Sequence, residues 1–360
     1  MIVSELAGVG ERLAELLGGE VSGLARLLGG ASRETWSFTL DGRPLVLRRD
    51  PPGAPRAGAM EREATVLRAA ASAGVPVPEV LSSGADFLVM SWLDGETIAR
   101  RILRDDAYAE ARPRLVAQCA RALASLHGGV APDDVPDLPT EPDVLASVRA
   151  TLDRLGEPHP AFELGLRRLA ATRPEATART VVHGDFRLGN WMVDGNGLVG
   201  VLDWELAHVG DPVEDLGWMC VRSWRFGASP PVAGVGTRAE LLAAYAAAGG
   251  LEVDEETLRW WEAYGTLRWG VICIQQAAAH LSGAVRSVEL AAIGRRVCEV
   301  ELDLLDLVAP NTVRTSPPEM VVGSVPTSGP HDRPTADELL EAVQEWMAGL
   351  SLEGRDAFLA

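Results

Sequence analysis

Hydrophobic and polar positions divide this chain of 360 residues into a strand-rich beginning and a helix-rich remainder. In the first part, helical spacing of apolar positions occurs at 4–18 and 59–73. Strands are expected at 21–28, 35–40, 44–49, 79–81 and 87–92. Asp41-Gly42, between two of these strands, is a strong hairpin signal. The pattern predicts a mainly antiparallel sheet with one internal helix.

From residue 94 onward the spacing becomes mainly helical. Helices are expected at 112–127, 143–155, 161–171, 237–248, 254–281 and 287–308, with a strand-like interruption at 180–204. Segment 309–334 is rich in Pro, Ser, Thr and Gly and is typical of a linker, and Thr335 and Glu338 match a helix capping box. We therefore expect an α+β fold with a sheet lobe at 1–93, a helical lobe at 94–308, a linker at 309–334 and a helical tail at 335–360.

Composition narrows the possible partners. Hydrophobic residues make up 47% of the chain, which is ample for packed cores. The net charge is −18 and no basic run occurs, which argues against nucleic-acid and membrane-surface binding. The four cysteines form no C-x-x-C pair, and the chain does not open with a basic start followed by an apolar run. We expect a cytoplasmic, reduced protein; the oligomeric state is not readable.

The chain contains no lysine, because all 33 basic residues are arginine. Genomic bias towards G and C explains most of this choice. It still has a chemical consequence, since any site that ordinarily uses a lysine must here use an arginine or nothing.

Two neighbouring segments carry the candidate chemistry. The first reads His183-Gly-Asp185-Phe-Arg-Leu-Gly-Asn190 and follows an apolar pair. The second reads Leu202-Asp203-Trp-Glu205 and follows another apolar stretch. Asp and Asn are also common in ordinary turns. So many polar positions in order, each after an apolar strand, favour a catalytic loop that binds a metal.

These segments resemble the protein-kinase pattern H-R-D-x-x-x-x-N followed by D-F-G. Their H-G-D and L-D-W-E variants are similar to those of aminoglycoside phosphotransferases and choline-kinase-like enzymes. The resemblance extends over about residues 29–308, and the sequence looks nearest to bacterial members of the family and to kinase-like domains fused to acyl-CoA dehydrogenases. The resemblance implies a two-lobed, protein-kinase-like fold that uses ATP and Mg²⁺.

The resemblance also implies roles for the loop residues. Asp185 would orient the acceptor hydroxyl and take its proton late in the transfer. Asn190 and Asp203 would hold Mg²⁺, which prefers hard oxygen ligands. Asp211 and Asp215 look like acids that brace the catalytic loop and the following helix, and His183 would order the loop.

Arg48 falls where such kinases usually have a phosphate-binding lysine. Strand alternation places Val46 and Arg48 on one face and Leu45 and Leu47 on the other. By resemblance, Glu63 on the first internal helix pairs with this cation. The alternatives are a solvated strand arginine and a solvated helix glutamate, and both stay open.

Two further segments are candidates for nucleotide contacts. Gly30 and Ser32 would belong to a flap over the ATP phosphates, although a plain β-turn fits the same residues. Ser91 and Leu93 would belong to the hinge that binds adenine through the backbone, although a buried strand that ends in a turn fits as well.

The sequence therefore predicts transfer of the ATP γ-phosphoryl group to a hydroxyl of a small molecule. The acceptor is left open between an aminoglycoside, a choline-like alcohol, a sugar and a hydroxyacyl compound. A catalytically weak nucleotide-binding or regulatory module is the alternative, motivated by the arginine at position 48. A metal-dependent hydrolase that uses the same acids lacks histidine ligands and explains neither lobe.

Overall fold

The computed structural model describes residues 2–27, 33–50, 58–141 and 143–309. The expected linker and C-terminal helix therefore lie outside the described residues, as do Gly30 and Ser32. Contacts divide the chain into two compact units, one of residues 1–144 and 172–265 and the other of residues 145–171 and the chain from 266. The lobe boundary expected after residue 93 stays a prediction. Every described candidate residue lies in the first unit.

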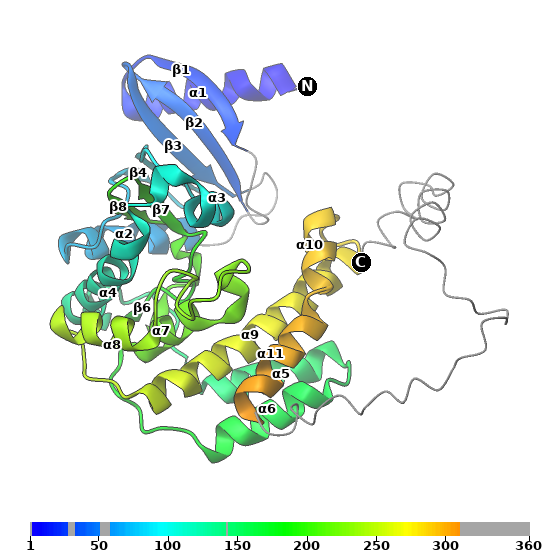
Figure 1. Ribbon diagram of the computed structural model, residues 1–360. Helices are drawn as coiled ribbons and strands as arrows, with labels where there is room; N and C mark the ends of the chain where they lie inside the picture. Colours follow the sequence, from blue (N-terminus) through cyan, green and yellow to red (C-terminus); the bar gives the residue numbers. More distant parts are fainter. Residues whose placement is uncertain (1, 28–32, 51–57, 142, 310–360) are drawn as a thin grey trace, which may run out of the picture. The chain divides into compact units, whose positions relative to one another are not determined.

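A five-stranded antiparallel sheet forms the beginning of the first unit (Figure 1). Its strands are β1 (Val21–Leu27), β2 (Glu34–Leu40), β3 (Arg43–Arg49), β4 (Val80–Ser83) and β5 (Phe87–Ser91), in the order β1-β2-β3-β5-β4. The hairpin between β2 and β3 turns at Asp41 and Gly42, where φ is 49° and 82°. Both values lie in the left-handed region that such a two-residue turn requires. The turn therefore forms where the sequence predicts it.

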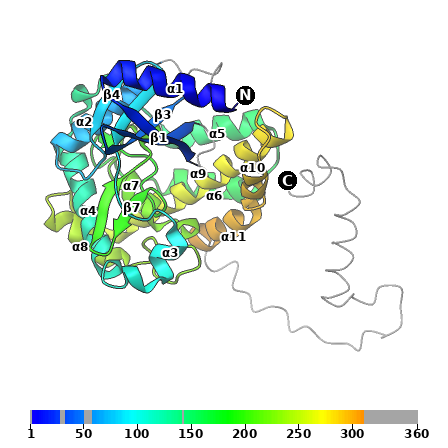
Figure 2. The same ribbon diagram turned by 90° about the horizontal axis from the view of Figure 1, so that it is seen from above.

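The two faces of this sheet have different neighbours. Helix α1 (Ile2–Leu17) lies along one face, as Figure 2 shows from above, and buries Val9 and Leu13 there. The sheet residues in the same core are Trp36, Phe38, Leu45, Leu47 and Val89. Full burial of a side chain of this kind contributes roughly 1.5–3 kcal/mol, so this core fixes which face is left for function.

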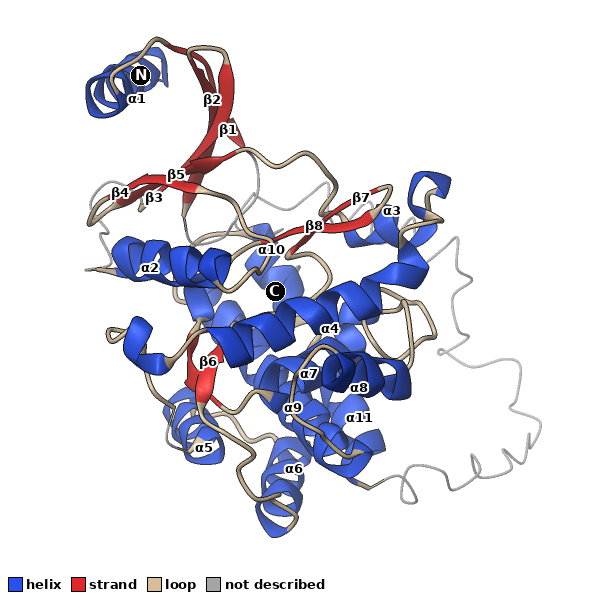
Figure 3. Ribbon diagram, turned by 90° about the vertical axis from the view of Figure 1, so that its left-hand side faces the viewer, coloured by secondary structure: helices blue, strands red, loops and turns tan. Residues whose placement is uncertain are grey.

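The opposite face turns towards helix α2 (Ala59–Ser72), which lies below the sheet in Figure 3. Val46 and Arg48 line a common cavity with Glu63 and Leu67 of this helix. The alternation expected for β3 is thus present, because its leucines enter the core and its intervening residues reach the cavity.

The remainder of the first unit is mainly helical. Its helices are α3 (Ala99–Arg104), α4 (Arg112–Gly129), α7 (Val213–Cys220), α8 (Arg238–Ala247) and the first part of α9 (Glu255–Leu281). Two antiparallel pairs, β6 (Thr180–Val182) with β9 (His208–Gly210) and β7 (Trp191–Asp194) with β8 (Gly197–Val201), frame the catalytic-loop segments. The α+β class expected from the sequence is confirmed.

The second unit contains most of α5 (Val144–Leu155), α6 (Pro160–Ala171), the later part of α9, α10 (Val288–Gly294) and α11 (Val297–Val308). A single helix at 287–308 was expected, and this is corrected: the helix ends at Gly294 and a new one begins at Val297. Glycine is a poor helix former, and a Cβ at Gly294 would lie 2.6 Å from that of Ala277. Among the described residues, no helix combines the length and apolarity needed to cross a bilayer.

Candidate functional site

A cavity of about 470 Å³ in the first unit collects most of the predicted site residues. The sheet contributes Val46, Arg48 and Met90, and α2 contributes Glu63. Asn190 and Asp203 from the two predicted loop segments line the same space, as do Ser91 and Leu93. Segments that lie far apart in the sequence therefore converge on one cavity.

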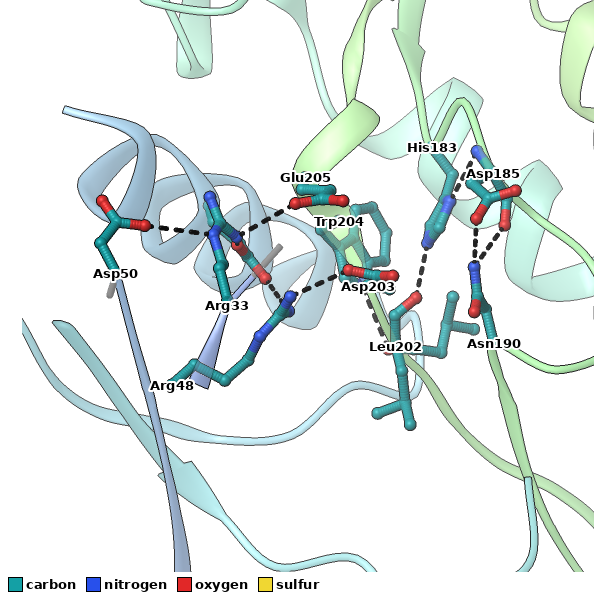
Figure 4. Close-up of polar contacts among 12 residues, drawn as sticks. Arg33, Arg48, Asp50, His183, Asp185, Asn190, Leu202, Asp203, Trp204 and Glu205 are labelled. Carbon is teal, nitrogen blue, oxygen red and sulfur yellow. Dashed lines mark hydrogen bonds and ion pairs between the residues drawn. The ribbon is translucent and has the colours of Figure 1, made fainter. Parts of the chain in front are cut away.

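Arg48 links the sheet to both other parts of the site (Figure 4). Its Nη1 donates to Oε1 of Glu63, and its Nη2 donates to Oδ1 of Asp203 at 2.9 Å. Burial opposes the charge of Arg48, but Glu63 and Asp203 outweigh this effect and raise the pKa of the guanidinium above its ordinary value. The guanidinium is thus a fixed cation on the cavity wall.

Glu63 is shared between two arginines. Arg33 donates from Nη1 to Oε2 of Glu63, while Oε1 receives Arg48. The Nε of Arg33 lies 3.5 Å from Oδ1 of Asp50, and its Nη1 lies 3.8 Å from Oε2 of Glu205. The Arg33 side chain is only 3% exposed and the Glu63 side chain 2%. Such burial of charge is tolerable because every charge has an opposite partner.

Sequence reasoning missed Arg33, although a signal for it existed. The two-residue turn at Asp41-Gly42 sets a register that pairs Glu34 with Arg49. Continued by one step beyond the strands, this register would place Arg33 opposite Asp50, and opposite charges across strands attract. The hairpin register would therefore have predicted this ion pair.

Asp185 is held by three side chains. Its Oδ1 accepts from Nε of Arg187 at 3.0 Å and from Nε1 of Trp218 at 2.8 Å. Its Oδ2 accepts from Nδ2 of Asn190 at 2.6 Å. Because the amide nitrogen of Asn190 is used in this way, its oxygen is directed elsewhere. The structure thus brings Asp185 and Asn190 into direct contact, and it adds two donors that sequence reasoning did not assign.

Buried Asp215 fixes the backbone of the catalytic loop at His183 and Gly184. Its oxygens accept from the backbone N–H groups of His183 at 2.7 Å and Gly184 at 2.9 Å. His127 donates to the same carboxylate from Nε2 at 3.2 Å. Burial alone would raise the pKa of Asp215, but the hydrogen bond from His127 and the backbone donor outweigh it and hold the pKa below its ordinary value.

Asp211 braces a different part of the site. Its Oδ1 accepts from the backbone N–H of Val213 at 2.9 Å, at the start of α7, and its Oδ2 accepts from that of Thr177 at 2.9 Å. It thus supplies an acceptor to the first orphan N–H groups of the helix. Asp215 therefore contacts the loop directly, whereas Asp211 anchors the helix that presents Asp215.

His183 joins the two motif segments. Its Nδ1 accepts from the backbone N–H of Asp185 at 3.1 Å, and its Nε2 donates to the carbonyl of Leu202 at 3.0 Å. The N–H of Leu202 donates to the carbonyl of Asn190 at 2.8 Å. These bonds place Asp203 beside Asn190. Asp203 adopts a left-handed backbone with φ 64° and ψ 65°, which Asp tolerates better than most residues.

The donor set for a metal is small. Asn190 and Asp203 line the same cavity, and the Asp203 side chain is 37% exposed. Across the described residues, no group of three or more His, Cys, Asp or Glu side chains is arranged to hold a metal ion. Any ion here would take two protein ligands and draw its other oxygens from water or a ligand.

The two predicted hinge residues differ in what they can offer. The N–H of Ser91 already donates to the carbonyl of Glu79 at 2.9 Å, and its Oγ accepts from the N–H of Glu79. The N–H of Leu93 donates to no group in the described part of the chain. Of the two residues predicted for the hinge, Leu93 is therefore the one with a backbone donor available to a ligand. Gly30 and Ser32 lie outside the described residues.

Comparison with known proteins agrees with these motifs. The family model described as "phosphotransferase enzyme family" matches residues 23–261. Acyl-CoA dehydrogenase family member 10 of Mus musculus is 31% identical over 233 residues, which cover 58% of this chain and 21% of that protein. The chain thus spans about a fifth of the length of this relative.

Solved structures show the same fold. A candidate aminoglycoside phosphotransferase from Ralstonia eutropha is 21% identical with a TM-score of 0.66, over 83% of this chain and 96% of that one. A choline/ethanolamine kinase family protein from Mesorhizobium loti is 23% identical with a TM-score of 0.60, over 84% and 95%. A thermostable mutant of an aminoglycoside phosphotransferase, in a ternary complex with ADP and hygromycin B, is 19% identical with a TM-score of 0.58, over 83% and 97%.

The resemblance to aminoglycoside phosphotransferases and choline-kinase-like proteins is confirmed by these matches. Since the family model covers well over half of the sequence and includes both loop segments, the chain belongs to the phosphotransferase enzyme family.

Proposed function

We propose that the protein transfers the γ-phosphoryl group of ATP, with Mg²⁺, to a hydroxyl of a small molecule. The observation on which this rests is that the Arg48–Glu63 pair, Asp203 and Asn190 border one cavity, with Asp185 bonded to Asn190. Phosphoryl transfer asks a protein mainly to position groups and to neutralise charge, and this set of residues suits both tasks.

The cavity fits a nucleotide in size and in chemistry. Its volume of about 470 Å³ lies within the usual range for small-molecule sites. Val46, Met90 and Val201 supply apolar walls suited to a base, and Leu93 offers a backbone N–H to its edge. Arg48 would hold the phosphates, with Glu63 fixing its direction.

The two oxygen donors fit Mg²⁺. The oxygen of Asn190 is left over by the bond of its nitrogen to Asp185, and Asp203 uses one oxygen for Arg48. Magnesium needs only one or two protein oxygens when phosphates and water complete its shell. When bound, the ion would neutralise charge on the phosphates. Asn190 and Asp203 would hold it there.

Asp185 would orient the acceptor hydroxyl and receive its proton. In the transfer, the bond between the γ-phosphorus and the bridging oxygen breaks, and a bond to the acceptor oxygen forms. ADP leaves and the hydroxyl proton passes to the Asp185 carboxylate. Correct placement of the reacting groups is the main contribution of such a residue.

Arg48 is the departure from the usual lysine. Arginine is a planar fork that can contact two phosphate oxygens at once, whereas lysine is a point charge. In the structure this fork bonds both Glu63 and Asp203. A phosphate bound at Nη2 would compete with the Asp203 contact, and this competition motivates a catalytically weak, nucleotide-binding module as the second candidate.

The acceptor class remains open between aminoglycoside, choline-like alcohol, sugar and hydroxyacyl compound. One similar structure holds hygromycin B, and one relative is an acyl-CoA dehydrogenase family member. These names motivate a panel of hygromycin B, choline, glucose and 3-hydroxybutyryl-CoA.

The test is a coupled assay of ADP release with MgATP and this panel. Wild type should release ADP with at least one member, while Asp185→Ala and Asp203→Ala should lose turnover and keep the wild-type melting temperature within a few degrees. Asp86→Ala is the matched control, because Asp86 is an exposed acid in the loop before β5. Full activity in either loop variant refutes the assignment, and ATP binding without any turnover selects the weak module.

A further inference from the structure

Asp185 and three side chains around it form a closed ring of contacts. Trp218 on α7 and Arg187 in the loop both donate to Oδ1 of Asp185, at 2.8 Å and 3.0 Å. The Arg187 guanidinium lies over the ring of Trp224, with Cζ 4.6 Å from the ring centre. Trp224 in turn packs against Trp218, with ring centres 5.3 Å apart. Each member thus fixes the position of the next.

We propose that Trp218 is a positioning residue for phosphoryl transfer, which rests on the function proposed above. Its indole N–H and Arg187 occupy Oδ1 of Asp185, so that the acceptor hydroxyl is received at Oδ2. The motif carried no signal for this role, because Trp218 lies 33 residues after the acid that it orients.

Counting acceptor sites supports this assignment. An ionised carboxylate has about two acceptor sites on each oxygen. Oδ1 uses both, for Trp218 and Arg187. Oδ2 accepts from Asn190 at 2.6 Å and shares the Arg187 N–H in a bifurcated hydrogen bond, at 3.2 Å against 3.0 Å for Oδ1. The most weakly held acceptor site is thus the one on Oδ2 that only shares the Arg187 N–H, and there the acceptor proton is taken as the new P–O bond forms.

The indole suits this task for two physical reasons. It is a donor only, so it cannot compete with Asp185 for the acceptor proton. It is also immobile: Trp218 is 2% exposed, and a Cβ on neighbouring Gly217 would lie 2.5 Å from that of Trp261 on α9. With α7 held this closely, the direction of the N–H is set by the fold.

The first test compares two Trp→Phe variants of the full chain. Trp218→Phe keeps an aromatic ring and removes the N–H. Trp191→Phe is the matched control: Trp191 is fully buried, its ring centre is 5.6 Å from that of Phe186 in the loop, and its N–H has no partner among the described residues. The readouts are ADP release with MgATP, with the panel acceptors and with water alone, resolved into kcat and KM for ATP.

Trp218→Phe should lower kcat roughly 10- to 100-fold, the loss expected for one hydrogen bond to a charged group, with KM for ATP within about twofold of wild type. A purely structural defect would move both constants, or would lower kcat equally in Trp191→Phe. Equal kcat in wild type and Trp218→Phe overturns the positioning role alone. Absence of ADP release from wild type overturns the proposed function, and the positioning role with it.

A second test does not depend on turnover. The indole N–H resonance of Trp218 is assigned in a ¹⁵N correlation spectrum by its disappearance in Trp218→Phe. In Asp185→Asn this resonance should move upfield, because a neutral amide is a weaker acceptor than a carboxylate. The indole resonance of Trp36, a buried tryptophan in the core under α1, should stay in place. An unchanged Trp218 resonance overturns the proposal, whatever the turnover of the Trp218→Phe variant.

Discussion

Glu63→Gln removes one charge from the centre of the arginine-carboxylate network and leaves the shape of the side chain unchanged. Each oxygen of Glu63 now accepts from a different arginine, Arg33 on one side and Arg48 on the other. A glutamine can offer its single oxygen to only one of them. Its NH₂ group then faces the other guanidinium, donor against donor.

The size of the effect follows from the burial of the three groups. Their side chains are 3%, 15% and 2% exposed for Arg33, Arg48 and Glu63, so water cannot replace the lost contacts. Removing one partner of a buried ion pair costs about 3–5 kcal/mol. Each arginine keeps a second carboxylate, Asp50 or Asp203, and we therefore expect a loss just below this range, about 2–3 kcal/mol.

Thermal unfolding measures this loss. For a unit of this size, 1 kcal/mol shifts the melting temperature by about 2–4 °C, so Glu63→Gln should melt about 5–10 °C below wild type. Glu61→Gln is the matched control, because Glu61 lies on the same helix and is exposed. A difference between the two variants below about 1 °C would show that Glu63 does not hold both arginines, and the geometry of the site would have to be revised.

Two further substitutions test the support of the catalytic loop. Asp215→Asn should lower stability by about 3 kcal/mol at pH 7, because a charged acceptor is lost. Burial would raise the pKa of Asp215, but the hydrogen bond from His127 and the other contacts hold this pKa below its ordinary value. The stabilisation by the Asp215 carboxylate is therefore present above the unfolded pKa of about 3.9 and is lost as pH falls towards the folded pKa. The gap between wild type and variant in melting temperature should therefore narrow from pH 6 to pH 3, and a constant gap contradicts this reasoning. Gly184→Ala should lower the free energy of unfolding, measured in urea, more than Gly74→Ala does. Both positions have positive φ, 77° and 85°. A Cβ at Gly184 would lie 2.4 Å from the carbonyl oxygen of Leu206, whereas one at Gly74 meets no described atom within 4 Å. The control should lose about 1–2 kcal/mol, and equal losses would rule out the clash.

Local patterns in the sequence determined most of the secondary structure. The strands, the Asp41-Gly42 turn and the long helices follow from side-chain period and turn chemistry, which depend on neighbours a few residues away. Residue spacing did not predict helix α7, although the resemblance implied a helix after the catalytic loop. All of its residues from Val213 to Cys220 are buried, so it has no polar face and no amphipathic period to detect.

The sequence also indicated which residues of the catalytic loop carry its chemistry, but not which residues surround them. Asp185, Asn190 and Asp203 stand in a recognisable order, and the structure brings them to one place. Which face of β3 met the cavity depended on where α1 packed, because strand alternation gives two sets of residues and does not say which is inside.

Only the tertiary structure decided the partners of these residues. Arg48 meets Asp203 across 155 positions of sequence, and Trp218 meets Asp185 across 33. Such contacts depend on how helices and strands pack against one another, and the spacing of residues along the chain does not predict this packing. The sequence thus determined which groups are available for chemistry, while packing decided which donors aim at the Asp185 carboxylate and which arginines share Glu63.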